Sequence, residues 1–130
     1  MRIMLDTNIL VSMIFFPSSQ TRELAKRLSY HELFLCDYVI DELRIVVDRK
    51  FKNKKEALEN FFIELPFQLI YTPRNINFDE FPSVRDQKDS PILATALIED
   101  IDIFITGDKD FLVLEIDRPE IMTMKDFLGL

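Results

Sequence analysis

Short apolar segments that alternate with helical segments constrain the fold of this chain more than any other feature. Within these segments apolar residues do not alternate with polar ones, which is typical of parallel strands covered by helices on both faces. Regular alternation of strands and helices favours right-handed crossovers and a mainly parallel sheet. We therefore expect an α/β fold, a three-layer sandwich around a central, mainly parallel five-stranded sheet. Its predicted strands are Arg2–Leu5, Leu33–Cys36, Phe67–Tyr71, Ile103–Thr106 and Ile121–Met122.

The segments between these strands carry helical signals. Their apolar residues recur at helical spacing, and prolines or capping residues mark several ends. Asp37 is predicted to cap the helix that follows it, and Asn53 with Glu56 is predicted to cap the next one. The predicted helices are Thr7–Phe16, Thr21–His31, Tyr38–Phe51, Lys54–Leu65 and Ser90–Glu99, with shorter helical turns at Lys109–Leu114 and Met124–Leu128.

The residue inventory excludes several kinds of chemistry. A length of 130 residues predicts one domain spanning residues 1–130. One histidine, His31, excludes a catalytic histidine pair, and one cysteine, Cys36, excludes an intrachain disulfide and a CxxC pair. Two glycines leave no glycine-rich phosphate loop. Carboxylates are abundant, with 23 Asp and Glu against 16 Lys and Arg, so acids and the metals they hold are the expected tools of an enzyme.

The apolar N-terminal segment resembles a signal peptide, but Asp6 and Asn8 interrupt it and the run that follows is too short for a bilayer span. We expect a cytoplasmic protein, because a lone cysteine fits a reducing compartment. A net charge of −7 argues against non-specific binding of nucleic acid. However, a carboxylate cluster filled by divalent cations would not repel phosphate as its formal charge suggests.

Four acids fall at positions that a parallel sheet would bring together. Asp6 follows the first predicted strand and Asp108 follows the fourth, so both are expected at the carboxyl ends of strands, where such sheets bind ligands. Asp89 precedes the helix that begins at Ser90, and Glu42 borders the buried stripe of its own helix. Carboxylates this close repel each other unless cations intervene, and Mg²⁺ and Mn²⁺ bind carboxylate oxygen. Two such ions can activate a water for attack on a phosphodiester.

Each acid also has a purely structural explanation. Asp6 can simply cap the first helix, and Glu42 can lie on a solvated helix surface. Aspartates are also common in turns, as at Asp86, Asp89, Asp108 and Asp110. The hypothesis of a metal site therefore rests on the shared placement of four acids at strand ends and helix starts.

Four segments resemble those of PIN-domain nucleases in both order and spacing. They are LDTNIL at Leu5–Leu10, DEL at Asp41–Leu43, RDQKDSPILATA at Arg85–Ala96 and ITGDKDFL at Ile105–Leu112. The ending IMTMKDFL also fits, so the resemblance covers almost the whole chain. Within the family, the chain resembles most the VapC-like toxins of bacterial and archaeal toxin–antitoxin pairs.

This resemblance implies a Mg²⁺- or Mn²⁺-dependent endoribonuclease that leaves a 5′-phosphate and a 3′-hydroxyl. It also implies a homodimer and an inhibitory antitoxin protein as partners, with RNA as the substrate. Carried over position by position, the catalytic and metal-binding quartet falls on Asp6, Glu42, Asp89 and Asp108, with Asp110 as a further metal ligand. Asp86 is an alternative or auxiliary acid three residues before Asp89, and Asn8 and Thr106 are polar supports.

Three alternative functions place different demands on the sequence. A catalytically silent module that binds a partner protein or RNA would keep the same fold. A phosphotransfer receiver domain needs an acidic pair after the first strand, where this chain has only Asp6. A haloacid-dehalogenase-type phosphatase needs a second acid two residues later, where this chain has Asn8.

Two further surface features have open interpretations. The basic run at 49–55 can hold RNA phosphates, meet an acidic partner or form a solvated loop. An apolar stripe at helical spacing can pack in the core or form a dimer or antitoxin surface, and it comprises Leu58, Phe61, Phe62 and Leu65.

Overall fold

The computed structural model describes residues 1–130 and contains one sheet of five strands, in which all four neighbouring pairs are parallel. The strand order is β3-β2-β1-β4-β5. The strands are β1 (Arg2–Leu5), β2 (Glu32–Cys36), β3 (Gln68–Ile70), β4 (Ile103–Ile105) and β5 (Glu120–Met122). The predicted α/β fold with a parallel five-stranded sheet is confirmed.

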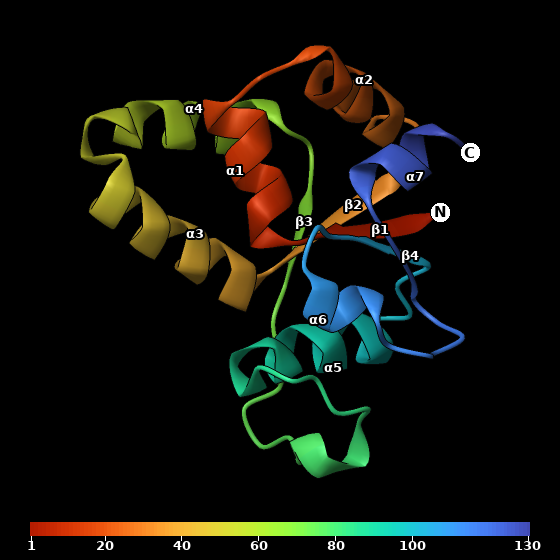
Figure 1. Ribbon diagram of the computed structural model, residues 1–130. Coiled ribbons are helices and arrows are strands. Elements are labelled where there is room, and N and C mark those ends of the chain that lie inside the picture. Colours follow the sequence, from red (N-terminus) through yellow and green to blue (C-terminus); the bar gives the residue numbers. More distant parts are fainter.

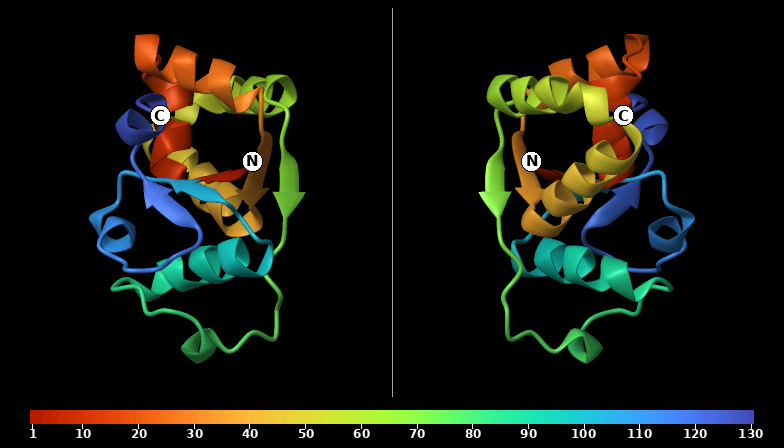
Figure 2. Two further views of the ribbon diagram at one scale, coloured as in Figure 1. Left: turned by 90° about the vertical axis from the view of Figure 1, so that its right-hand side faces the viewer. Right: turned by 90° about the vertical axis from the view of Figure 1, so that its left-hand side faces the viewer.

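Helices cover both sides of this sheet (Figure 1). On one side lie α1 (Thr7–Phe15), α2 (Ser19–Leu28), α3 (Asp37–Lys50) and α4 (Lys55–Glu64), and on the other lie α5 (Ser90–Ile98) and α6 (Lys109–Leu112). The last helix, α7 (Met124–Leu128), packs beside α2. The long connection from β3 to α5 hangs below α5 in Figure 2 and contains two 3-10 turns, Phe78–Glu80 and Gln87–Asp89. None of the helices has both the length and the apolar character that a membrane span needs.

Burial along the strands follows their place in the sheet. The central strand β1 buries Ile3, Met4 and Leu5 completely, because helices cover both of its faces. The edge strands instead expose polar residues, as at Gln68 in β3 and Glu120 in β5. The continuous apolar runs of the sequence therefore mark the central strands most clearly.

Two of the predicted helix caps are wrong. Helix α3 begins at Asp37 itself, and the carboxylate of Asp37 accepts a hydrogen bond of 3.1 Å from the backbone N–H of Thr72. This contact ties the end of β3 to the start of α3. Asn53 lies in a 3-10 turn, and α4 begins at Lys55 without any side-chain cap.

Helix α2 begins earlier than predicted. Helix α2 starts at Ser19 because Ser18 and Thr21 cap each other reciprocally. The Ser18 side chain accepts from the backbone N–H of Thr21, and the Thr21 hydroxyl accepts from the backbone N–H of Ser18. The helix ends at Leu28, three residues before the predicted end at His31.

The pairing register of β1 with β4 positions the carboxyl edge of the sheet. Leu5 pairs with Ile105, so the next residues, Asp6 and Thr106, lie side by side. The backbone N–H of Asp6 also donates to the carbonyl of Ile105 over 3.0 Å. From this edge the chain leaves β1 towards β2 and leaves β4 towards β5, which is the switch point where parallel sheets open a crevice.

Phe104 is the fully buried centre of β4, and its ring meets that of Phe111 edge to face at 4.9 Å. We expect Phe104→Ala to lower the free energy of unfolding by about 3–5 kcal/mol, because a large side chain is lost from a closed core. Val113, which is 72% exposed, provides the surface control, and Val113→Ala should change the free energy of unfolding by less than about 0.5 kcal/mol. Urea denaturation of both variants would check this, and similar losses would show that β4 is not the core of the sheet.

Candidate active site

Asp6 lies at the carboxyl end of β1 and is 5% exposed. One carboxylate oxygen accepts from the backbone N–H of Thr7 over 2.8 Å, and the other accepts from the Thr106 hydroxyl over 2.6 Å. Asp6 therefore also caps α1, so the structural explanation of this residue and its place in the cluster are both correct. Two hydrogen bonds fix the orientation of its carboxylate.

Thr106 joins the two strand ends that carry acids. Its hydroxyl donates to Asp6 and accepts from the backbone N–H of Asp108 over 3.0 Å. Asp108 in turn caps α6, because its Oδ1 accepts from the backbone N–H of Asp110 over 2.9 Å. A short hydrogen-bonded path therefore runs from the end of β1 through the end of β4 to the first turn of α6.

The structure separates the two acids at 86 and 89. Asp89 is 9% exposed, and its carboxylate lies with those of Asp108 and Asp110 so that one oxygen from each falls within 4.8 Å of the others. Asp86 is exposed and caps the preceding 3-10 turn by accepting from the backbone N–H of Lys88. The 3-10 turn thus directs Asp89 into the cluster and leaves Asp86 at the surface.

A buried polar network anchors the helix that presents Asp89. The hydroxyls of Thr72, after β3, and Thr95, on α5, hydrogen bond to each other. The Thr95 hydroxyl also donates to the carbonyl of Pro91 over 2.7 Å, and the Thr72 hydroxyl contacts the thiol of Cys36. These contacts fix the first turns of α5 against the ends of β2 and β3.

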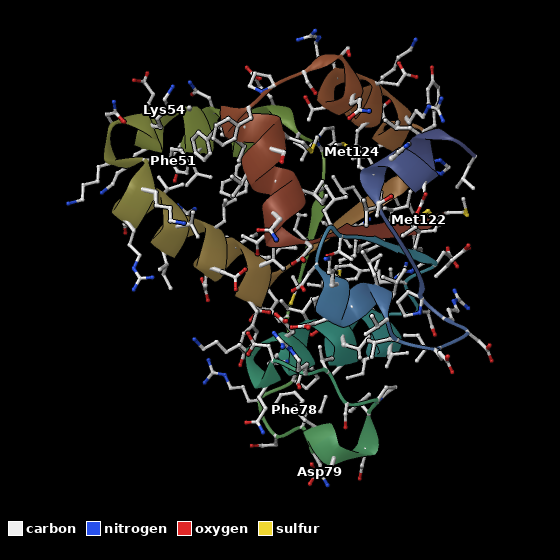
Figure 3. The ribbon with its side chains drawn as sticks, in the orientation of Figure 1. Phe51, Lys54, Phe78, Asp79, Met122 and Met124 are labelled. Carbon is white, nitrogen blue, oxygen red and sulfur yellow. The ribbon has the colours of Figure 1, made fainter.

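Glu42 stands at the rim of the cluster rather than inside it. It is exposed on α3, near the N-terminal end of that helix. Its charge is close enough to raise the pKa values of both Asp6 and Asp89. In Figure 3 oxygen atoms gather where the N-terminal end of α3 meets α5 and α6. The structure therefore brings all four acids of the predicted quartet to one end of the sheet, with Asp110 beside them.

Burial and mutual repulsion shape the electrostatics of the cluster. Burial raises the pKa of Asp6, while the hydrogen bonds from Thr106 and Thr7 oppose the rise. Burial, followed by repulsion from Asp108 and Asp6, raises the pKa of Asp89 to about 7. The N-terminal ends of α1, α3 and α5 face this edge of the sheet, and their helix dipoles favour negative charge. The cluster thus concentrates negative charge that its hydrogen bonds and helix dipoles only partly offset.

Carboxylate oxygens are the ligands that hard divalent cations prefer. One oxygen each from Asp89, Asp108 and Asp110 can therefore converge on a single ion, with the buried Asp6 next to them. The cluster contains no histidine or thiol that would favour a softer metal. This donor set fits Mg²⁺ or Mn²⁺.

A groove of about 1000 Å³ adjoins the cluster and is lined from α1, α3 and the start of α5. Glu42 lies on its wall together with apolar residues such as Val11 and Val46, and the basic Lys50 lies on the same wall. Phe51 also lines it and stacks on Phe15 of α1 with ring centroids 4.4 Å apart. The groove thus runs from acidic residues to the start of the basic run.

One contact of the acidic cluster has no clear signal in the sequence. The Nε of Arg85 lies 3.0 Å from Oδ1 of Asp110, and this is the only ion pair made by any acid of the cluster. Arg85 belongs to the RDQKD segment, but nothing in that pattern indicates which acid its side chain would meet. The signal is only that a cation stands one residue before two closely spaced acids.

The sequence matches the PIN domain family over residues 3–116. The chain therefore belongs to the PIN domain family, whose members are nucleases. Among solved structures, it is similar to VapBC2 from Rickettsia felis bound to a DNA fragment from their promoter, with 19% sequence identity and a TM-score of 0.75. That alignment covers 94% of this chain and 97% of the other, and it shows a shared fold. A comparison with curated proteins gives no match.

The raised pKa of Asp89 predicts a pH-dependent stability in the metal-free protein. Between about pH 4 and 7 the folded state holds a proton on Asp89 that the unfolded state has lost, so this group removes stability as pH rises. We expect Asp89→Asn to raise the free energy of unfolding by roughly 2 kcal/mol at about pH 8. This figure is below the full value of the shift because water screens part of the repulsion.

The gain should shrink as pH falls through this range and vanish below about pH 3, where Asp89 is protonated in both the folded and the unfolded state. Denaturation in the presence of a chelator, at several pH values, measures the difference between variant and wild type. Asp126→Asn, on the exposed surface of α7, makes the same chemical change away from the cluster and should show no such trend. If the free energies of unfolding of Asp89→Asn and the wild type differ by the same amount at every pH, the raised pKa of Asp89 is contradicted.

Proposed function

We propose that this protein is a metal-dependent endoribonuclease. Asp6, Glu42, Asp89 and Asp108 form its catalytic quartet, and these four with Asp110 hold Mg²⁺ or Mn²⁺. The observation that carries the proposal is the convergence of Asp89, Asp108 and Asp110, with carboxylate oxygens within 4.8 Å of one another, beside the buried Asp6. Bound divalent ions would supply Lewis-acid activation of water and stabilise the leaving oxygen of the phosphodiester.

The residues of the chain hold this site ready before any ligand arrives. Thr106 and the backbone of Thr7 keep the Asp6 carboxylate in one orientation, so little rearrangement is needed for binding. The cap of α6 fixes one oxygen of Asp108 in the same way. Glu42, at the rim, would complete the ligand set from the side of α3, and Asn8 and Asp86 would support it from the surface.

The substrate chemistry follows from the surroundings of the cluster. Lys50, on the wall of the groove, belongs to a basic run that continues through Lys52, Lys54 and Lys55. These cations can attract the phosphates of an RNA strand, which the acidic surface elsewhere would repel. Divalent ions in the cluster would cancel the remaining repulsion at the scissile phosphate.

We further propose that the protein is the cytoplasmic toxin of a toxin–antitoxin pair and forms a homodimer. The likeness to the VapBC2 structure supports the toxin role and the antitoxin partner, because that structure contains both members of such a pair. The groove beside the cluster is a suitable place for an antitoxin segment, since it combines apolar walls with acidic and basic ends. A segment bound there would block access of RNA to the acids.

Purified protein should cleave RNA in the presence of Mg²⁺ or Mn²⁺ and lose the activity in a chelator. Asp6→Asn should reduce the cleavage rate by at least about 100-fold, because it removes a ligand charge that the fold orients. Asp126→Asn makes the same change on exposed α7 and should cleave like the wild type. Single-turnover cleavage of labelled RNA measures the rates.

Equal cleavage by wild type and Asp6→Asn would point to a contaminating nuclease and contradict the proposal. Calorimetry provides a second, independent measurement. Absence of Mn²⁺ binding at millimolar concentration would favour the alternative, a catalytically silent PIN module that binds a partner protein or RNA.

A further inference from the structure

Arg85 makes the one ion pair of the acidic cluster, and the arginine side chain of this pair is largely exposed to solvent. Its side chain is 87% exposed, whereas that of Asp110 is 19% exposed. Its Nε lies 3.0 Å from Oδ1 of Asp110, but the two side chains form no hydrogen bond with each other. Exposed ion pairs of this kind are readily exchanged for other partners.

The carboxylate that Arg85 contacts belongs to the group that fits a cation. Asp110 contributes one of the three oxygens that lie within 4.8 Å of one another. A guanidinium beside these oxygens and a divalent ion among them repel each other, because both carry positive charge. The two therefore compete for the negative charge of the same cluster.

We propose that Arg85 is a resident counter-cation of the cluster, and that it exchanges Asp110 for an RNA phosphate when a divalent ion binds. This inference rests on the proposed metal-dependent nuclease function. In the metal-free protein the guanidinium neutralises part of the excess charge. Once an ion takes the carboxylate, the guanidinium is released at the mouth of the site, where its donors match the oxygens of a phosphate.

The exchange requires that the Arg85 side chain can move while the backbone that carries it stays in place. Its neighbour Val84 is 6% exposed and packs in the core, while Asp86 caps the following turn through the backbone N–H of Lys88. The backbone at Arg85 is thus held on both sides. The side chain itself makes no other ion pair or hydrogen bond, so it can move without breaking other structure.

The inference predicts opposite effects of one substitution on two ligands. Arg85→Gln should bind Mn²⁺ about three- to tenfold more tightly than the wild type in the absence of RNA, because a competing charge is removed. At saturating Mn²⁺ it should raise KM for RNA about five- to tenfold with little change in kcat, because a phosphate contact is lost. Loss of the free Mn²⁺ signal in electron paramagnetic resonance measures the first effect, and steady-state cleavage measures the second.

Two further variants make the test specific. Arg85→Lys keeps the charge and should stay within about twofold of the wild type in Mn²⁺ affinity. Lys88→Gln removes a charge from the same connection, next to Asp89, but Lys88 makes no ion pair, so its effect on Mn²⁺ affinity should be smaller than that of Arg85→Gln. Circular dichroism confirms that the variants are folded, which the exposure of both side chains leads us to expect.

An unchanged or weaker Mn²⁺ affinity of Arg85→Gln would overturn the inference, and so would an unchanged KM. If the wild type binds Mn²⁺ and cleaves RNA while Arg85→Gln behaves identically, the proposed nuclease function stands and only the role of Arg85 fails. If the wild type binds no Mn²⁺ at all, both fail together.

Discussion

The in-register pairing of β1 with β4 is the interaction on which this molecule depends. It places Asp6 beside Thr106 at the carboxyl edge of the sheet and allows the hydrogen bond of 2.6 Å between them. The same pairing sets the turn that presents Asp108 and Asp110. Because the chain diverges from these two strands in opposite directions, nothing from the sheet itself fills the space between their ends. The acids occupy that space.

Concentrating carboxylates at this edge opposes folding, and the structure shows how the cost is contained. Hydrogen bonds from a hydroxyl and from backbone N–H groups stabilise charge on Asp6, while Asp89 keeps a pKa of about 7 and so shares its site with a proton. Three helix N-terminal ends and the guanidinium of Arg85 add positive potential. Such perturbed groups in a crevice are typical of sites that bind or transform ligands. The apolar sheet beneath supplies the stability that the site removes.

Much of the fold and part of the site follow from local sequence alone. The buried strands are continuous apolar runs, and acids placed directly after them, as Asp6 is, must meet at one edge once the sheet is parallel. Contacts between residues far apart in the sequence could not be predicted in this way. The carboxylate of Asp37 was expected to cap its helix, but it serves the backbone of Thr72, 35 residues away. No local pattern indicates such a partner.

The same limit applies to the finer details of the cluster. In the linear pattern Asp89 is distinguished from Asp86 only by its place next to the start of α5, and the 3-10 turn at Gln87–Asp89 is what buries Asp89 and leaves Asp86 exposed. The membership of Glu42 depends on how α3 is placed against α5. The contact of Arg85 with Asp110 joins the connection before α5 to the first turn of α6, and these two segments meet only in the folded molecule. Side-chain chemistry could be predicted from the residues, but the pairing of side chains required the tertiary structure.

The chain order of the sheet has a consequence for synthesis in the cell. The central strand β1 is made first, yet its partner β4 follows about a hundred residues later, so the sheet closes only when most of the chain has left the ribosome. The bond between Asp6 and Thr106 spans 100 positions of sequence. A nascent chain therefore carries Asp6 without the other carboxylates of the cluster, and the candidate site can assemble only after β4 has been made.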